Sequence, residues 1–194
     1  KTRNYVNEWV FHQFSDIIGL LSTTYEFISV TINGFDYGVF AIEEHFDKQL
    51  VESRNRREGP ILKMDESGAW AYHYKLDKVD NKPRFPVFNA SMISLFKENR
   101  TLKNPNLKMN FEEGQVLLHL FKTGYLGIED VFDIDQLAKF YVLMELSAHN
   151  HALAWHNRRF YFNPVTQKIE HIVYDVIPFS IRDNYKSNVM HNLL

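Results

Sequence analysis

Apolar and polar positions in the first part of the chain predict a helix followed by a β-hairpin. Between residues 3 and 18 the apolar side chains recur every three or four positions, which is the period of a helix with one buried face. Residues 25–43 are rich in β-branched and aromatic side chains, and Asn33-Gly34 in their middle is a strong hairpin turn signal. A helix and an antiparallel hairpin are therefore expected at the start of the chain.

The next part of the pattern is shorter and less regular. A polar helix is expected to begin near Asp47, and Gly59-Pro60 then interrupts the chain before a short strand that carries Lys63. From residue 65 to residue 110 aromatic side chains are frequent but follow no sustained period. This segment is expected to be an ordered insertion with short helices, because so many aromatic side chains seldom remain solvated.

Periodicity returns in the last part of the chain. Residues 111–122 have the pattern of a helix, and residues 134–148 form a continuous apolar stripe that Asp133 or Asp135 can cap. A loop rich in His and Asn follows, and then a hairpin whose second strand ends at Asp175. The sequence thus predicts a helical part that leads into a polar loop and a hairpin.

Composition excludes several classes of protein. Hydrophobic residues make up 45% of the 194 residues and aromatic residues 15%, which is typical of a packed domain. A formal charge of −2 argues against a surface built for nucleic acid, and no apolar run is long enough for a transmembrane segment. The absence of Cys excludes disulfides and thiolate metal sites. The arginines Arg54, Arg56 and Arg57 are expected to lie at a solvated helix end.

Four histidines, His149, His151, His156 and His171, lie close together in the sequence. Imidazole is the commonest neutral metal ligand, so this density raises the possibility of a His-liganded metal site. The spacing matches no known zinc signature, and most of these histidines are expected to be structural or to support other groups. A His-liganded metal hydrolase is kept as a third alternative.

Asn157 and Asp175 form a second candidate site. They stand eighteen residues apart, on either side of the predicted hairpin. An amide oxygen and a carboxylate are hard ligands that suit magnesium, and protein kinases hold the metal of ATP with an Asn and an Asp placed in this way. The structural alternative is that Asn157 caps a turn and Asp175 caps a loop.

Three blocks in order resemble the CotH family of spore-coat and secreted proteins, which are atypical protein kinases. Val30–Asp47 is similar to the family's strand, NG turn, strand and Glu-x-x-Asp segment, and Gly59–Asp65 is similar to its Gly-x-Leu-x-Lys stretch. The helix, the loop with Asn157 and the aromatic strands that end at Asp175 complete the resemblance.

The resemblance implies an α+β, protein-kinase-like two-lobed fold that is partial, with antiparallel β-hairpins in the first lobe and a helical second lobe. Residues 1–64 would be part of a nucleotide lobe, residues 65–110 the aromatic insertion, and residues 111–194 the helical lobe with a segment like a catalytic loop. The strand that carries the phosphate-binding Lys would lie before residue 1.

The resemblance also implies a site that binds ATP and magnesium. Asn157 and Asp175 would be the metal ligands, and Glu44, near the hinge, and Lys63 would be contacts to the nucleotide. The family's catalytic-loop Asp should stand five residues before Asn157, where this chain has Ala152. The neighbouring His151 is the candidate substitute base, because a neutral imidazole can accept a proton near pH 7.

Two functions from different classes follow from the resemblance. The first is a CotH-like kinase domain that binds ATP with magnesium and transfers a phosphoryl group to a protein hydroxyl. The alternative is a non-catalytic CotH-like module, or pseudokinase, that binds a cell-surface or coat protein. Whether the chain is an enzyme stays open between them, because Ala152 favours the second and Asn157 and Asp175 favour the first. An extracellular or cell-envelope location is what the family implies.

Overall fold

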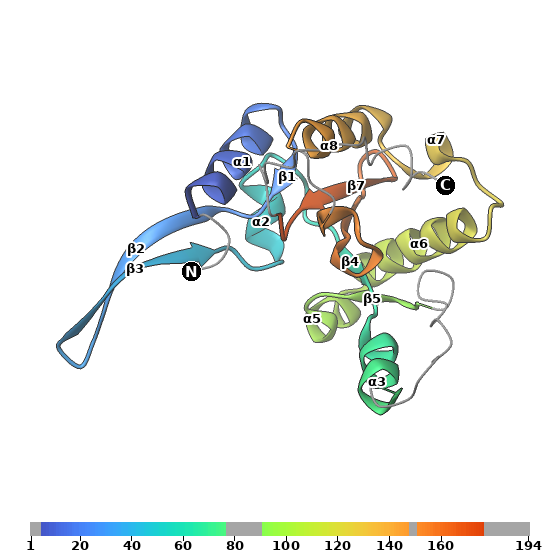
Figure 1. Cartoon of the computed structure of the whole chain (residues 1–194). Helices are drawn as coiled ribbons and strands as arrows, with labels where there is room; N and C mark the ends of the chain where they lie inside the picture. The colour runs from blue at the N-terminus through green and yellow to red at the C-terminus, as the bar shows by residue number, and fades with distance from the viewer. Residues whose placement is uncertain (1–4, 77–90, 148–150, 177–194) are drawn as a thin grey trace.

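In the computed structural model, which describes residues 5–76, 91–147 and 151–176, the chain opens with helix α1 (Tyr5–Ile17). Strands β2 (Tyr25–Ile32) and β3 (Phe35–Glu43) then form an antiparallel hairpin that extends away from the rest of the chain (Figure 1). Both turn residues have left-handed backbones, with φ of 53° at Asn33 and 83° at Gly34. The sequence prediction of a helix and an Asn-Gly hairpin is confirmed, and positive φ at both central residues is the type I′ turn that matches the twist of the strands.

A five-stranded mixed sheet collects segments that are far apart in the sequence, in the order β1-β7-β6-β4-β5. Strand β1 is parallel to β7, and the other neighbours are antiparallel. The strands are β1 (Leu21–Ser22), β4 (Ile61–Met64), β5 (Ile93–Leu95), β6 (Arg159–Asn163) and β7 (Lys168–Val173). Mixed helices and antiparallel hairpins confirm the predicted α+β class.

The remaining helices are α2 (Lys48–Glu52), α3 (Ser67–Leu76), α5 (Glu98–Lys103), α6 (Pro105–Lys122), α7 (Ile128–Val131) and α8 (Ile134–Leu146). Helices α6, α7 and α8 lie against strands of the sheet, whereas α3 lies apart from it (Figure 1). Helix α8 is capped by Asp133, whose carboxylate accepts from the backbone N–H of Gln136 at 3.0 Å. Of the helices that the structure describes, none is long and apolar enough to cross a bilayer.

The predicted aromatic insertion, residues 65–110, is more regular than its sequence pattern indicates. It contains α3, β5 and α5, and β5 pairs with β4 in the central sheet; residues 77–90 lie outside the described residues. Helix α6 begins at Pro105 and not at residue 111, because Asn104 accepts backbone N–H bonds at the helix start and Pro is well suited to the first helical position. The three-part division of the chain stays a prediction, although the sheet takes a strand from every part.

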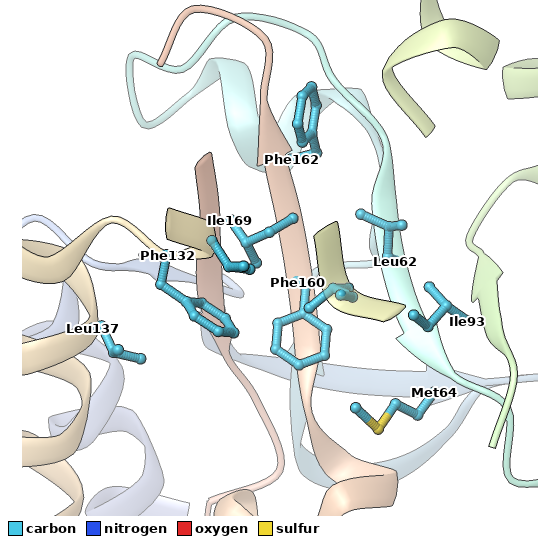
Figure 2. Close-up of a cluster of buried hydrophobic side chains, with 10 residues drawn as sticks. Leu62, Met64, Ile93, Phe132, Leu137, Phe160, Phe162 and Ile169 are labelled. Atoms are coloured by element: carbon cyan, nitrogen blue, oxygen red, sulfur yellow. The ribbon is translucent and has the colours of Figure 1, made fainter. Parts of the chain in front are cut away.

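The main hydrophobic core lies between the sheet and the helices α6 to α8 (Figure 2). Figure 2 shows side chains from β4, β6 and β7 gathered with others from β5 and the helical side. The labelled members are Leu62, Met64, Ile93, Phe132, Leu137, Phe160, Phe162 and Ile169. A second cluster packs α1 and α8 against the end of β7, and it includes Phe11, Phe140, Met144 and Val173.

Two of the three arginines after α2, Arg54 and Arg56, are not solvated as predicted, whereas Arg57 is exposed. Arg54 is 13% exposed, and its guanidinium contacts Asp16 Oδ1 at 3.1 Å and Glu44 Oε2 at 3.3 Å. Arg56 Nε contacts Glu170 Oε2 at 3.0 Å, and Glu170 is only 2% exposed. The prediction for these two residues was wrong, because the chain after α2 turns inward and places the cations between α1, the root of the hairpin and the central sheet.

Candidate functional site

The candidate site lies where the loop before β6 meets the chain after β7. Arg159 at the start of β6 pairs with Ile172 near the end of β7. Because the two strands are antiparallel, the residues just before Arg159 and just after Val173 lie at the same end of the hairpin. The loop consists of two short 3₁₀ turns, His151–Leu153 and Trp155–Asn157.

His151 contacts both of the predicted metal ligands. Its ring Nε2 lies 2.9 Å from Oδ2 of Asp175, and the Asn157 amide Nδ2 donates to its backbone carbonyl at 3.0 Å. The Asp175 side chain is 12% exposed and that of His151 is 39% exposed, so the pair stands at an opening to solvent. The structure therefore brings together the three residues that the sequence selected at this end of the hairpin.

Asp175 has a left-handed backbone with a φ of 53°. This conformation is uncommon for residues other than Gly, although Asp tolerates it better than most. Such outliers are found preferentially at functional sites, where the surrounding structure holds them in place. In this chain, the left-handed residue stands two positions after Val173, the last residue of β7, and places a carboxylate beyond the end of the hairpin.

Asn157 and Asp175 fit a magnesium ion by their donor chemistry. Asn157 is 7% exposed, and the bond from its Nδ2 to the His151 carbonyl fixes the orientation of the amide. The amide oxygen Oδ1 therefore points away from that carbonyl and can act as a ligand. Together with the Asp175 carboxylate it would supply the few hard oxygen ligands that magnesium takes from a protein, and this role stays a prediction.

Ala152 does not face this opening. It is 3% exposed and belongs to the hydrophobic cluster that contains Phe11, Met144 and Val173. Position 152 is the place where the resemblance expects the catalytic Asp, yet its side chain points into the core. The neighbouring His151 contacts Asp175 through its ring.

Within the part of the chain that the structure describes, the other histidines do not assemble into a metal site. His171 is 3% exposed and stacks on Phe132 and Phe140, and the rings of His151 and His156 have centroids 6.5 Å apart. His149 lies outside the described residues. Among the residues that the structure describes, no three His, Asp or Glu side chains are arranged to hold a metal. The structure gives no support to the His-liganded hydrolase.

The two predicted nucleotide contacts have structural partners. The Glu44 carboxylate accepts from the backbone N–H and the hydroxyl of Thr24 and from Arg54, so it fixes the root of the β2–β3 hairpin. Lys63 Nζ lies 5.1 Å from the centroid of the Phe96 ring. The roles of Glu44 and Lys63 as nucleotide contacts stay predictions.

Sequence reasoning missed a carboxylate near the loop. Burial lowers the pKa of His156 below its ordinary value, and the negative charges of Glu66 and Asp175 oppose that shift. Glu66 therefore lies within electrostatic reach of the candidate site, and its Oε2 accepts from Trp70 Nε1 at 2.9 Å. The sequence carried no signal for it, because Glu66 stands at the start of the segment without periodicity.

Comparison with known families identifies one match. The model of the CotH kinase protein family matches residues 3–177, a range that includes the loop with His151 and Asn157 and also Asp175. No individual curated protein matches the chain. Because the matched range covers far more than half of the 194 residues, the chain belongs to the CotH kinase protein family.

Proposed function

We propose that this chain binds ATP with magnesium through Asn157 and Asp175 and transfers the terminal phosphoryl group to a protein hydroxyl. The observation that carries the proposal is that His151 contacts Asn157 through its backbone and Asp175 through its ring. One short loop and the end of one strand thus supply two oxygen ligands and one imidazole. Membership of a kinase family supports the same chemistry.

Asn157 Oδ1 and the Asp175 carboxylate would hold the metal ion. Bound magnesium neutralises charge on the phosphates, and phosphoryl transfer depends mainly on such neutralisation and on positioning. The chain contributes rigidity: Asn157 is buried and hydrogen-bonded, and Asp175 is fixed by the left-handed turn after β7. A ligand pair held in this way loses little freedom when the nucleotide binds.

His151 would accept the proton of the acceptor hydroxyl. In a neutral ring that donates from Nε2 to Asp175 Oδ2, the second nitrogen, Nδ1, is the one without a proton and carries the lone pair that accepts one. As the hydroxyl oxygen forms its bond to the terminal phosphorus and the bond to the ADP oxygen breaks, the proton passes to Nδ1. The Asp175 carboxylate then stabilises the imidazolium that results.

Mg-ATP is expected to stabilise the wild-type chain, and Asp175→Ala is expected to abolish the effect. A ligand at one hundred times its Kd adds about 2.7 kcal/mol to the free energy of unfolding, which raises the Tm by roughly 5–10 °C for a chain of this size. Asp135→Ala is the matched control, because it removes an exposed carboxylate on α8. Thermal unfolding with ATP and with or without magnesium makes the measurement, and a wild type that shows no shift would refute nucleotide binding.

His151→Ala is expected to reduce phosphoryl transfer by about 10²- to 10⁴-fold while leaving the chain folded. The measurement is incorporation of label from γ-labelled ATP into the chain itself or into a generic protein acceptor. Incorporation that His151→Ala leaves unchanged would show that another group is the base.

A second candidate, the non-catalytic CotH-like module or pseudokinase, is favoured by Ala152, because the loop has no carboxylate at that position. It predicts Mg-ATP stabilisation that Asp175→Ala removes, together with no transfer by the wild type. Both functions predict the same result for Asp175→Ala, so label transfer by the wild type is the measurement that separates the kinase from the pseudokinase.

A further inference from the structure

A buried cation stands at the start of β6, two residues after Asn157. Arg159 is 8% exposed, and its Nη1 donates to the backbone carbonyls of His156 at 2.7 Å and Arg158 at 3.1 Å. These two carbonyls lie on either side of Asn157. The guanidinium thereby holds the turn in which the predicted metal ligand is placed.

The same guanidinium packs against the segment that carries the other ligand. Its Cζ lies 5.1 Å from the ring centroid of Tyr174, the residue that directly precedes Asp175. The ring centroids of Phe46 and Phe96 lie 5.8 Å and 5.6 Å from the same Cζ atom, so these rings also enclose the guanidinium. A planar guanidinium stacks on aromatic rings in a way that the ammonium of Lys cannot reproduce.

Burial of the Arg159 charge costs free energy, so packing alone does not account for an arginine at this position. Burial lowers the pKa of the guanidinium, and the nearby Tyr174, Glu66 and Asp175 oppose that shift. Its Nε is buried without a hydrogen-bond partner among the described residues. Stability does not explain why position 159 is an arginine, because an apolar side chain of similar volume often replaces a buried ion without loss of stability.

We propose that Arg159 is a positioning residue that fixes the separation of Asn157 and Asp175, so that both can ligate one magnesium ion. Hydrogen bonds hold the Asn157 turn, and ring stacking holds the Tyr174–Asp175 segment, on one rigid side chain. This inference rests on the proposed function, because it assigns Arg159 to the metal site of the same kinase-like centre. Residues that orient metal ligands typically change metal affinity about 10- to 100-fold when they are replaced.

The test is the magnesium concentration that gives half-maximal thermal stabilisation at fixed ATP. Arg159→Lys keeps the charge but loses the planar fork, and it is expected to raise this midpoint by about tenfold or more. Arg56→Lys is the control, because Arg56 is likewise largely buried and donates to backbone carbonyls, but its ion pair is with Glu170 and it does not contact the site. A purely structural role predicts that both variants lose stability in urea while neither changes the midpoint.

The outcomes are distinct. A midpoint that rises in Arg159→Lys and stays constant in Arg56→Lys supports the positioning role. An unchanged midpoint in Arg159→Lys, with the wild type responding to magnesium, overturns this inference and leaves the proposed function intact. A wild type that does not respond to Mg-ATP overturns both. If Arg159→Lys fails to fold, Tyr174→Leu is the second variant, because it removes one stacking contact on the Asp175 side. A raised magnesium midpoint in Tyr174→Leu supports the positioning role, and an unchanged midpoint overturns it.

Discussion

Ala152→Asp is expected to lower the free energy of unfolding by about 3–5 kcal/mol and to add no phosphoryl transfer. The substitution restores the residue type that the family resemblance expects, so a motif comparison alone predicts a gain of activity. The structure predicts the opposite, because position 152 is 3% exposed and packs among Phe11, Met144 and Val173. A carboxyl group there loses its hydration without reaching Asp175.

Urea unfolding of the wild type, Ala152→Asp and Ala152→Asn would measure this cost. Asn has nearly the shape of Asp without its charge, so it separates the volume of the new side chain from its ionisation. Burial favours the neutral form of a carboxyl group, so the penalty of Asp relative to Asn should grow as the pH rises from 5.5 to 8. A variant with wild-type stability and higher transfer would show that position 152 reaches the site and that the missing carboxylate limits catalysis.

The regular elements could be predicted because their signals are local. The Asn33-Gly34 turn requires positive φ at two residues, and Asp133 caps α8 through its own neighbours. The start of α6 was placed too late, because the apolar period begins later than the cap at Asn104. Local chemistry thus determines which elements form, and the apolar pattern defines their ends less well.

Partners across the fold could not be predicted in the same way. The sequence predicts that Arg54 and Arg56 are solvated, because nothing in the residues next to them along the chain shows that Asp16 and Glu170 are their partners in the folded structure. The direction of Ala152 also depends on how the loop packs on α1 and α8.

The proximity of the site residues was easier to anticipate. Asn157 and Asp175 flank one hairpin, and an antiparallel pair of strands brings its two ends together whatever the rest of the fold. The contact of His151 with both required the structure, because it depends on the 3₁₀ turns of the loop. The sequence therefore predicts that the hairpin brings Asn157 and Asp175 close together. The contacts that His151 makes with them depend on tertiary packing.

Two buried histidines are expected to make the fold sensitive to acid. Burial lowers the pKa of His12 to about 4, with Asp16 opposing the shift, and burial holds the pKa of His171 well below its ordinary value, with the charge of Arg158 adding to the effect. In both cases the unfolded chain binds the proton more readily than the folded chain. Their contribution is therefore complete above the unfolded pKa of about 6.5 and is lost as the pH falls below it.

The cause at His171 is its surroundings. The ring stacks on Phe132 and Phe140 at centroid distances of 5.5 Å and 4.6 Å, and an edge contact to Phe160 encloses it. Neither ring nitrogen has a hydrogen-bond partner among the described residues. An imidazolium in this position would have no acceptor for its protons, so protonation favours unfolding.

The free energy of unfolding should fall with a slope of about 1.4 kcal/mol per pH unit for each of these histidines once the pH is below about 6, and the slope from His12 should end near pH 4. His171→Leu fills a similar space without a titrating group, so it should remove the share of the slope that His171 contributes. Phe160→Leu disturbs the same cluster without changing a titrating group, so its loss of stability should be nearly constant with pH.

Urea unfolding from pH 7.5 to pH 5 compares the wild type with His171→Leu and Phe160→Leu. Parallel curves for the wild type and His171→Leu would show that protonation of this ring does not drive acid unfolding, whereas a shallower curve for His171→Leu alone assigns acid sensitivity to the aromatic enclosure on β7.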